Sequence, residues 1–133
     1  MTSKVRYKGN LRTECEHVKS GSIIYTDAPT DNNGKGELFS PTDLVATALA
    51  SCMITVMGIK ANQSNIAFEN VSADVVKVMG SGPRRIIESK VEVVVEENWT
   101  EKERTLMEFT GKNCPVAKSL HTDMIQSISF IYK

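Results

Sequence analysis

A stretch without any charged residue, from Leu44 to Ile59, limits most strongly what this chain can fold into. Its side chains are apolar or small, so a helix formed here has no polar side to turn toward water. Such a helix either crosses a membrane or lies in a protein core. The stretch is shorter than the roughly 20 apolar residues that a membrane span needs, and no second apolar stretch accompanies it. We therefore predict a core helix and no membrane association.

The residues before this stretch have the features of a helix start. Ser40 can cap a helix, Pro41 suits the first helical position, and Asp43 is favoured near the positive end of the helix dipole. The predicted helix continues to about Asn62. A small domain cannot easily enclose a helix that is apolar on all sides, so we expect a second copy of the chain to cover it in an intertwined homodimer.

Segments with β-strand patterns lie on both sides of the predicted helix. Turn formers at Gly9-Asn10 predict a hairpin, and a loop rich in turn formers is expected from Asp27 to Glu37. Thr100 and Glu103 match the capping box of an amphipathic helix. The order of elements predicts one α+β domain over residues 1–133. The expected strands cover residues 5–7, 11–18, 22–26, 67–79, 84–97 and 125–132.

Composition and charge exclude several classes of partner. The chain has 133 residues, with 16 basic and 16 acidic side chains, so its formal net charge is zero. A basic surface for nucleic acid or anionic lipid is therefore not expected. The N-terminus has no apolar stretch typical of a secretory signal, so we expect a cytoplasmic protein. Its three cysteines form no CxxC pair, and structural disulfides are not expected in a reducing compartment.

Two cysteines lie in settings that predict different chemistry. Cys52 is in the middle of the apolar helix, where a free cysteine usually packs as a small hydrophobic residue and gains little from the helix dipole. Cys114 precedes Pro115 at the start of a predicted short helix, where unpaired backbone amides stabilise a thiolate. Local position alone therefore predicts Cys114 as the more acidic thiol. The structural alternatives are packing for Cys52 and simple helix capping for Cys114.

Other reactive arrangements find less support in the sequence. A zinc site would need Cys15 and His17 to meet Cys114 and His121, and this spacing matches no compact zinc motif. No nucleophile-elbow motif of a hydrolase is present. The glycine-rich segment after Met79 lacks the lysine of a phosphate-binding loop and is typical of a hairpin turn.

Two longer motifs resemble a known family. SPTDLVATALASC (Ser40–Cys52) and NCPVAKSL (Asn113–Leu120) resemble the two cysteine motifs of the OsmC/Ohr family, the osmotically induced and organic hydroperoxide resistance proteins. The motifs occur in the family's order, the expected elements agree over nearly the whole chain, and the chain looks closest to the OsmC-like branch. The resemblance implies an α+β intertwined homodimer in which long central helices are enclosed by antiparallel sheets.

The resemblance also implies roles for individual residues. Cys52 would be the thiolate that attacks a hydroperoxide, and Cys114 would then form a disulfide with it. Arg12 lies at about the place of the family's catalytic arginine, which a glutamate near the helix start holds in position. That glutamate is replaced by Thr42, so Glu37 or Asp43 would have to supply the carboxylate.

The function implied by the resemblance is a thiol-dependent peroxidase. It would reduce organic hydroperoxides in oxidative stress defence, and a dithiol reductant of the lipoyl or thioredoxin type would restore its thiols without a cofactor or metal. Apolar side chains of the central helix, Met53, Val56, Met57 and Ile59, could line a pocket for the organic part of the substrate. The alternative is an OsmC-like protein that binds an apolar ligand or senses redox state with little peroxidase turnover, an alternative favoured by Thr42.

Overall fold

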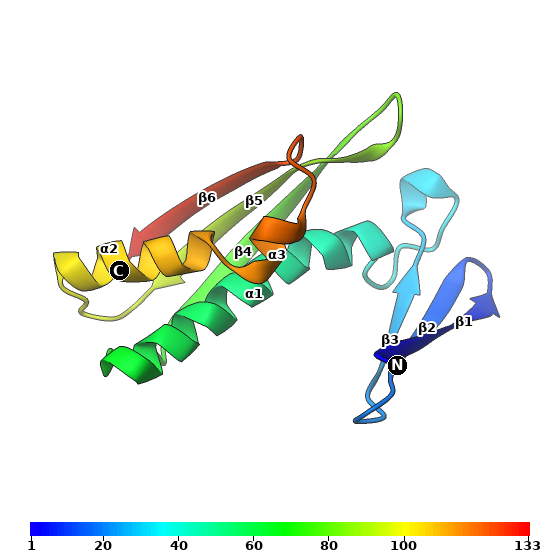
Figure 1. Ribbon diagram of the computed structural model, residues 1–133. Coiled ribbons are helices and arrows are strands. Elements are labelled where there is room, and N and C mark those ends of the chain that lie inside the picture. Colours follow the sequence, from blue (N-terminus) through cyan, green and yellow to red (C-terminus); the bar gives the residue numbers. More distant parts are fainter. The chain divides into compact units, whose positions relative to one another are not determined.

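A computed structural model describes residues 1–133, which form two compact units, Met1–Val45 and Ala46–Lys133. The first unit holds three strands, a short 3-10 helix and the first turn of the long helix, and the second unit holds the rest. Figure 1 labels these elements. In chain order they are β1 (Ser3–Gly9), β2 (Arg12–His17), β3 (Ile23–Asp27), η1 (Thr30–Asn32), α1 (Pro41–Ser64), β4 (Val71–Gly80), β5 (Arg85–Val95), α2 (Glu101–Lys112), α3 (Pro115–Ser119) and β6 (Ile125–Tyr132).

The first unit is built on an antiparallel sheet of β1, β2 and β3, in that order. The predicted hairpin turn lies between β1 and β2, where Asn10 and Leu11 both have positive φ. One face of the sheet carries charged pairs such as Arg6 with Glu14. The opposite face carries apolar side chains that are largely exposed, including Val5 and Tyr7. Val5 and Tyr7 are therefore apolar residues of this sheet face that stay more than half open to solvent.

The second unit contains a sheet with the order β4-β5-β6, against which α1 packs (Figure 1). The β4–β5 pair is antiparallel, whereas β6 runs parallel to β5. This sheet is therefore mixed, and the expectation of purely antiparallel sheets is wrong for it. The parallel pairing is possible because α2 and α3 lie between β5 and β6 in the chain. This connection returns the chain to the end of the sheet where β5 begins.

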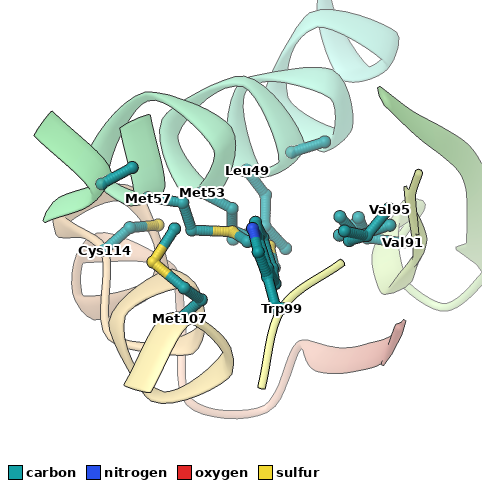
Figure 2. Packing of buried hydrophobic residues seen from close by; sticks show 11 residues of the cluster. Leu49, Met53, Met57, Val91, Val95, Trp99, Met107 and Cys114 are labelled. Atoms are coloured by element: carbon teal, nitrogen blue, oxygen red, sulfur yellow. The ribbon is translucent and has the colours of Figure 1, made fainter. Parts of the chain in front are cut away.

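The core lies between α1 and the inner face of this sheet. Leu49, Met53 and Met57 on α1 are fully buried, and Val91, Val93 and Val95 of β5 alternate into the same core, as the period of two predicts. Trp99 packs nearby, with its ring stacked on Phe68. Figure 2 shows this packing from close by.

Only one side of α1 is buried by the chain itself. Its buried residues recur at helical spacing from Ala46 to Ala61, whereas Ile59 is 53% exposed. The expectation that α1 is covered on every side is thus not met within one chain. α1 has 24 residues, and an 18-residue window within it has a mean hydropathy of 1.8, so it is long and apolar enough to cross a membrane, but a core helix meets the same criterion.

The α+β fold class and the order of elements agree with the sequence analysis. The boundaries differ most at β4, which begins at Val71 rather than at residue 67, and at β1, which covers Ser3–Gly9 rather than 5–7. β3 extends by one residue to Asp27, which was assigned above to the loop. The predicted capping box of α2 is present, because Thr100 and Glu103 each accept a hydrogen bond from the other's backbone N–H. The prediction of a single domain over residues 1–133 stays a prediction.

Candidate active site

The two cysteines of the sequence motifs meet in the second unit. Cys52 lies on α1 and is half-buried, whereas Cys114 precedes α3 and is only 1% exposed. The two thiols are near neighbours, because Cys52 is among the groups that raise the pKa of the Cys114 thiol, after the larger effect of burial. Cys114 belongs to the buried hydrophobic cluster beneath α1, and Cys52 packs against that cluster. The fold thus brings a partly accessible thiol and a buried thiol together.

Cys114 is the N-cap of α3, as its place before Pro115 predicts. Its Sγ accepts a hydrogen bond from the backbone N–H of Ala117, at an N–S distance of 3.4 Å. This bond lowers the pKa of the thiol, but burial has the larger effect and raises it. Burial therefore outweighs the effect of the helix start, from which an acidic Cys114 was predicted. Capping could be predicted from local sequence, whereas the burial depends on α1 and α2.

Methionine side chains surround the buried thiol. Met53, Met57 and Met107 are fully buried, and Figure 2 shows them gathered with Cys114 beside α1. Gly111 of α2 makes room for them, because a Cβ atom at this position would lie 2.9 Å from Sδ of Met57. Methionine is flexible and polarisable, so this wall can adapt its shape more readily than one of branched side chains.

In the first unit, Arg12 forms a two-point ion pair with Asp27. Nε of Arg12 lies 2.7 Å from Oδ1 of Asp27, and Nη2 lies 2.9 Å from Oδ2. The register of the sheet pairs these residues directly across β2 and β3. The side chain of Asp27 is 1% exposed, and hydrogen bonding to Arg12 holds the pKa of its carboxyl group below the ordinary value.

Neither Glu37 nor Asp43, the carboxylates expected to hold Arg12, is its main partner. Oε1 of Glu37 lies 3.6 Å from Nη2 of Arg12, and its side chain is 63% exposed. Asp43 accepts a hydrogen bond from the backbone N–H of Ser40, while its own N–H donates to the Ser40 hydroxyl, which completes a capping box at the start of α1. Glu37 is therefore a secondary neighbour of Arg12, and Asp43 stabilises the helix start.

Asp27 is the residue that sequence reasoning missed. It opens the segment DAPTDNNGKGE, whose turn formers predicted a loop. The available signal was an aspartate directly after the β-branched and aromatic residues Ile23–Thr26, and in the structure this aspartate is the last residue of the strand. Pairing with Arg12 depends on strand register, which the sequence pattern did not define.

The four residues considered for zinc do not form a metal cluster. No group of three or more histidine, cysteine, aspartate or glutamate side chains in the chain is arranged to hold a metal ion. Nδ1 of His17 is hydrogen-bonded to Ser20, and Nδ1 of His121 accepts from the backbone N–H of Asp123. Cys15 contacts the hydroxyl of Thr13 on the same strand.

Comparisons of the sequence and of the structure with known proteins point to the same family. Residues 34–127 match the family model described as OsmC-like protein. A crystal structure from Psychrobacter arcticus 273-4, provisionally described as an osmotic stress induced and detoxification response protein, is 47% identical, with a TM-score of 0.94 over 98% of this chain and 95% of that one. No curated protein matches the chain at a significant level.

More distant structures share the fold. An OsmC-like protein from Mycoplasma pneumoniae is 14% identical, with a TM-score of 0.81 over 98% of this chain and 94% of that one. A protein from Legionella pneumophila, described as an organic hydroperoxide resistance protein OsmC, is 17% identical, with a TM-score of 0.73 over 98% of this chain and 97% of that one. Together with the family model and the relative at 47% identity, these likenesses show that the chain belongs to the OsmC-like family.

Proposed function

We propose that this protein is a thiol-dependent peroxidase that reduces organic hydroperoxides. The observation that carries the proposal is that the half-buried Cys52 packs against the hydrophobic cluster that contains the buried Cys114 and is near enough to affect its pKa. Family membership supports it, as does the description of the Legionella pneumophila structure as an organic hydroperoxide resistance protein. The proposed task is oxidative stress defence.

In the proposed reaction, the Cys52 thiolate attacks the terminal oxygen of the hydroperoxide. The O–O bond breaks, Cys52 becomes a sulfenic acid, and the alkoxide takes a proton and leaves as an alcohol. Cys114 then attacks the Cys52 sulfur, so that a disulfide forms and water leaves. A cellular dithiol of the lipoyl or thioredoxin type reduces the disulfide and is itself oxidised. A reducing compartment such as the cytoplasm supplies that dithiol.

Burial assigns the two thiols to different steps. Because burial raises the pKa of Cys114, this residue favours the thiol form and can donate its S–H to the sulfur of Cys52. The half-buried Cys52 is the thiol that a substrate reaches first. Arg12 is the proposed cation that stabilises the Cys52 thiolate and polarises the peroxide. Glu37 supports Arg12 from the exposed side, and Asp43 contributes by fixing the start of α1.

The proposed active form is a homodimer. The side of α1 that carries Ile59, and the sheet face that carries Val5 and Tyr7, are apolar surfaces left exposed by one chain. Burial of both by a second copy would remove them from water. Light scattering during size-exclusion chromatography should give twice the chain mass, and Ile59→Glu should shift the protein toward the monomer. A wild-type protein that stays monomeric at high concentration would contradict the dimer.

The peroxidase is tested by following the thiols after one equivalent of cumene hydroperoxide. Reduced wild type should lose both Cys52 and Cys114 and give a peptide pair linked by their disulfide in mass spectrometry. Cys114→Ser should stop at a sulfenic acid on Cys52 that dimedone traps, and Cys52→Ser should consume no peroxide. Cys15→Ser is the matched control and should leave turnover unchanged. Cys15 lies on β2, on the opposite face of the strand from Arg12.

A second candidate is an OsmC-like protein that binds an apolar ligand or senses redox state. It is favoured by Thr42, which stands where the family's glutamate is expected. If wild-type Cys52 stays reduced with excess hydroperoxide and a dithiol donor, the peroxidase proposal fails. An apolar ligand that copurifies with the protein would then support binding, whereas slow oxidation without turnover would support sensing.

A further inference from the structure

The two-point ion pair in the first unit has a specific consequence for the chemistry. We propose that Asp27 is the positioning residue that orients Arg12 for hydroperoxide reduction. It would replace the glutamate that the family carries at the position of Thr42. This inference rests on the proposed function and assigns a role to a residue that the family motifs do not include. Four features of the ion pair support it.

The first feature is geometry. Both oxygens of Asp27 accept hydrogen bonds from Arg12, at 2.7 Å from Nε and 2.9 Å from Nη2. Parallel bonds of this kind fix the plane of the guanidinium group as well as its distance. The third nitrogen, Nη1, takes part in neither bond. The carboxylate therefore holds two nitrogens and leaves the third for another acceptor.

The second feature is the rigidity of the carboxylate itself. Asp27 lies at the end of β3, where its backbone N–H donates to the carbonyl of Phe39 and its Oδ2 accepts from the N–H of Glu37. The side chain is 1% exposed. A buried carboxylate bound from the strand and from the following loop has few alternative conformations, so it can act as a fixed reference for Arg12.

The third feature is the difference in exposure between the two partners. Arg12 is 34% exposed, whereas Asp27 is almost fully enclosed. The cation is therefore the member of the pair that can reach a substrate, and the carboxylate acts only through it. Asp27 is for this reason a positioning residue rather than a catalytic one.

The fourth feature is the weakness of the competing contact. Glu37 approaches only Nη2 of Arg12, at 3.6 Å, from a side chain that is 63% exposed. Exposed ion pairs of this kind constrain a side chain little. Of these two carboxylates, Asp27 is therefore the one that defines where the guanidinium group points.

The test measures the second-order rate of Cys52 oxidation by cumene hydroperoxide in the full chain. Asp27→Asn should lower this rate by about tenfold or more, in the range seen for residues that orient a functional group. Glu37→Gln should lower it by less. The matched control is Glu16→Gln, on the same strand as Arg12. It removes a carboxylate from an ion pair with Arg6 of β1 and should leave the rate within about twofold.

A double-mutant cycle separates positioning from a general effect on folding. If Asp27 acts through Arg12, Asp27→Asn should change the rate by less than about twofold in an Arg12→Gln background. The same large loss in both backgrounds would overturn the inference. If Asp27→Asn does not fold, Asp27→Glu is the variant that tests the inference, because its longer side chain keeps the charge but displaces the guanidinium group. Its rate should fall, and a wild-type rate would overturn the positioning role.

The outcomes distinguish this inference from the proposed function. An inert wild type contradicts the peroxidase itself and the positioning role with it. An active wild type together with an equally active Asp27→Asn variant contradicts only the inference. An active wild type with the selective loss described above supports both.

Discussion

Met57 and Gly111 pack closely, and this contact predicts that the effect of Gly111→Ala on stability has opposite signs with and without the Met57 side chain. The two residues face each other across α1 and α2 in the core of the second unit, and a Cβ atom on Gly111 would lie 2.9 Å from Sδ and 3.3 Å from Cγ of Met57. The perturbation is Gly111→Ala, made alone and in a Met57→Ala background.

The magnitudes follow from packing and helix propensity. Met57→Ala should destabilise by about 3 kcal/mol, since truncation of a buried side chain costs about 0.8 kcal/mol per methylene-sized group plus the cavity left behind. Gly111→Ala alone should destabilise by about 1 kcal/mol, because overpacking exceeds the gain in helix propensity. In the Met57→Ala background the crowding is gone, so Gly111→Ala should stabilise by about 0.5 to 1 kcal/mol.

Urea unfolding measures these changes. Trp99 is the single tryptophan of the chain and is 5% exposed in the native core, so its fluorescence reports on unfolding of the second unit. Protein concentration must be equal for all variants, because association couples to stability. The same sign for Gly111→Ala in both backgrounds would refute the reasoning, since it would mean that contact with Met57 does not determine its effect.

Three further predictions concern single interactions. Trp99→Phe should cost about 1 to 3 kcal/mol in urea unfolding followed by circular dichroism, because the indole N–H no longer donates to the carbonyl of Ala67 at 2.7 Å; an unchanged midpoint would contradict this. Thr100→Ala should cost about 1 kcal/mol in the same assay through loss of the α2 capping box, whereas Thr100→Ser should retain most of it. Because Arg12 holds the pKa of Asp27 below its ordinary value of 3.8, the pair stabilises the fold above that pH and stops doing so as pH falls through the folded-state pKa. The melting temperature of wild type should therefore fall more steeply below about pH 4 than that of Asp27→Asn, and parallel curves would contradict the linkage.

Local sequence was sufficient for most elements of the fold. The hairpin at Gly9-Asn10, the start of α1 at Ser40 and the capping box of α2 all depend on residues close together in the chain, and the structure has each of them. The alternation of Val91, Val93 and Val95 also gave the buried face of β5 correctly. These features are determined by backbone geometry and by the period of side chains, which sequence displays directly.

The features that could not be predicted depend on residues far apart in the chain. The ion pair of Arg12 and Asp27 requires the register between β2 and β3, and the raised pKa of Cys114 requires burial by helices that precede it. The parallel direction of β6 depends on where α2 and α3 return the chain. In each case a contact between distant parts of the chain, rather than a local signal, decided the outcome.

The position of β6 has a consequence for synthesis of the protein. This strand follows every other element in chain order, yet Ile128, Phe130 and Tyr132 on it pack against the core beneath α1. A ribosome therefore releases β4, β5 and α1 before the strand that completes their sheet, and the nascent core stays open until β6 has emerged. Loss of β6, by a premature stop codon or by proteolysis, would leave that core open to chaperones and proteases permanently.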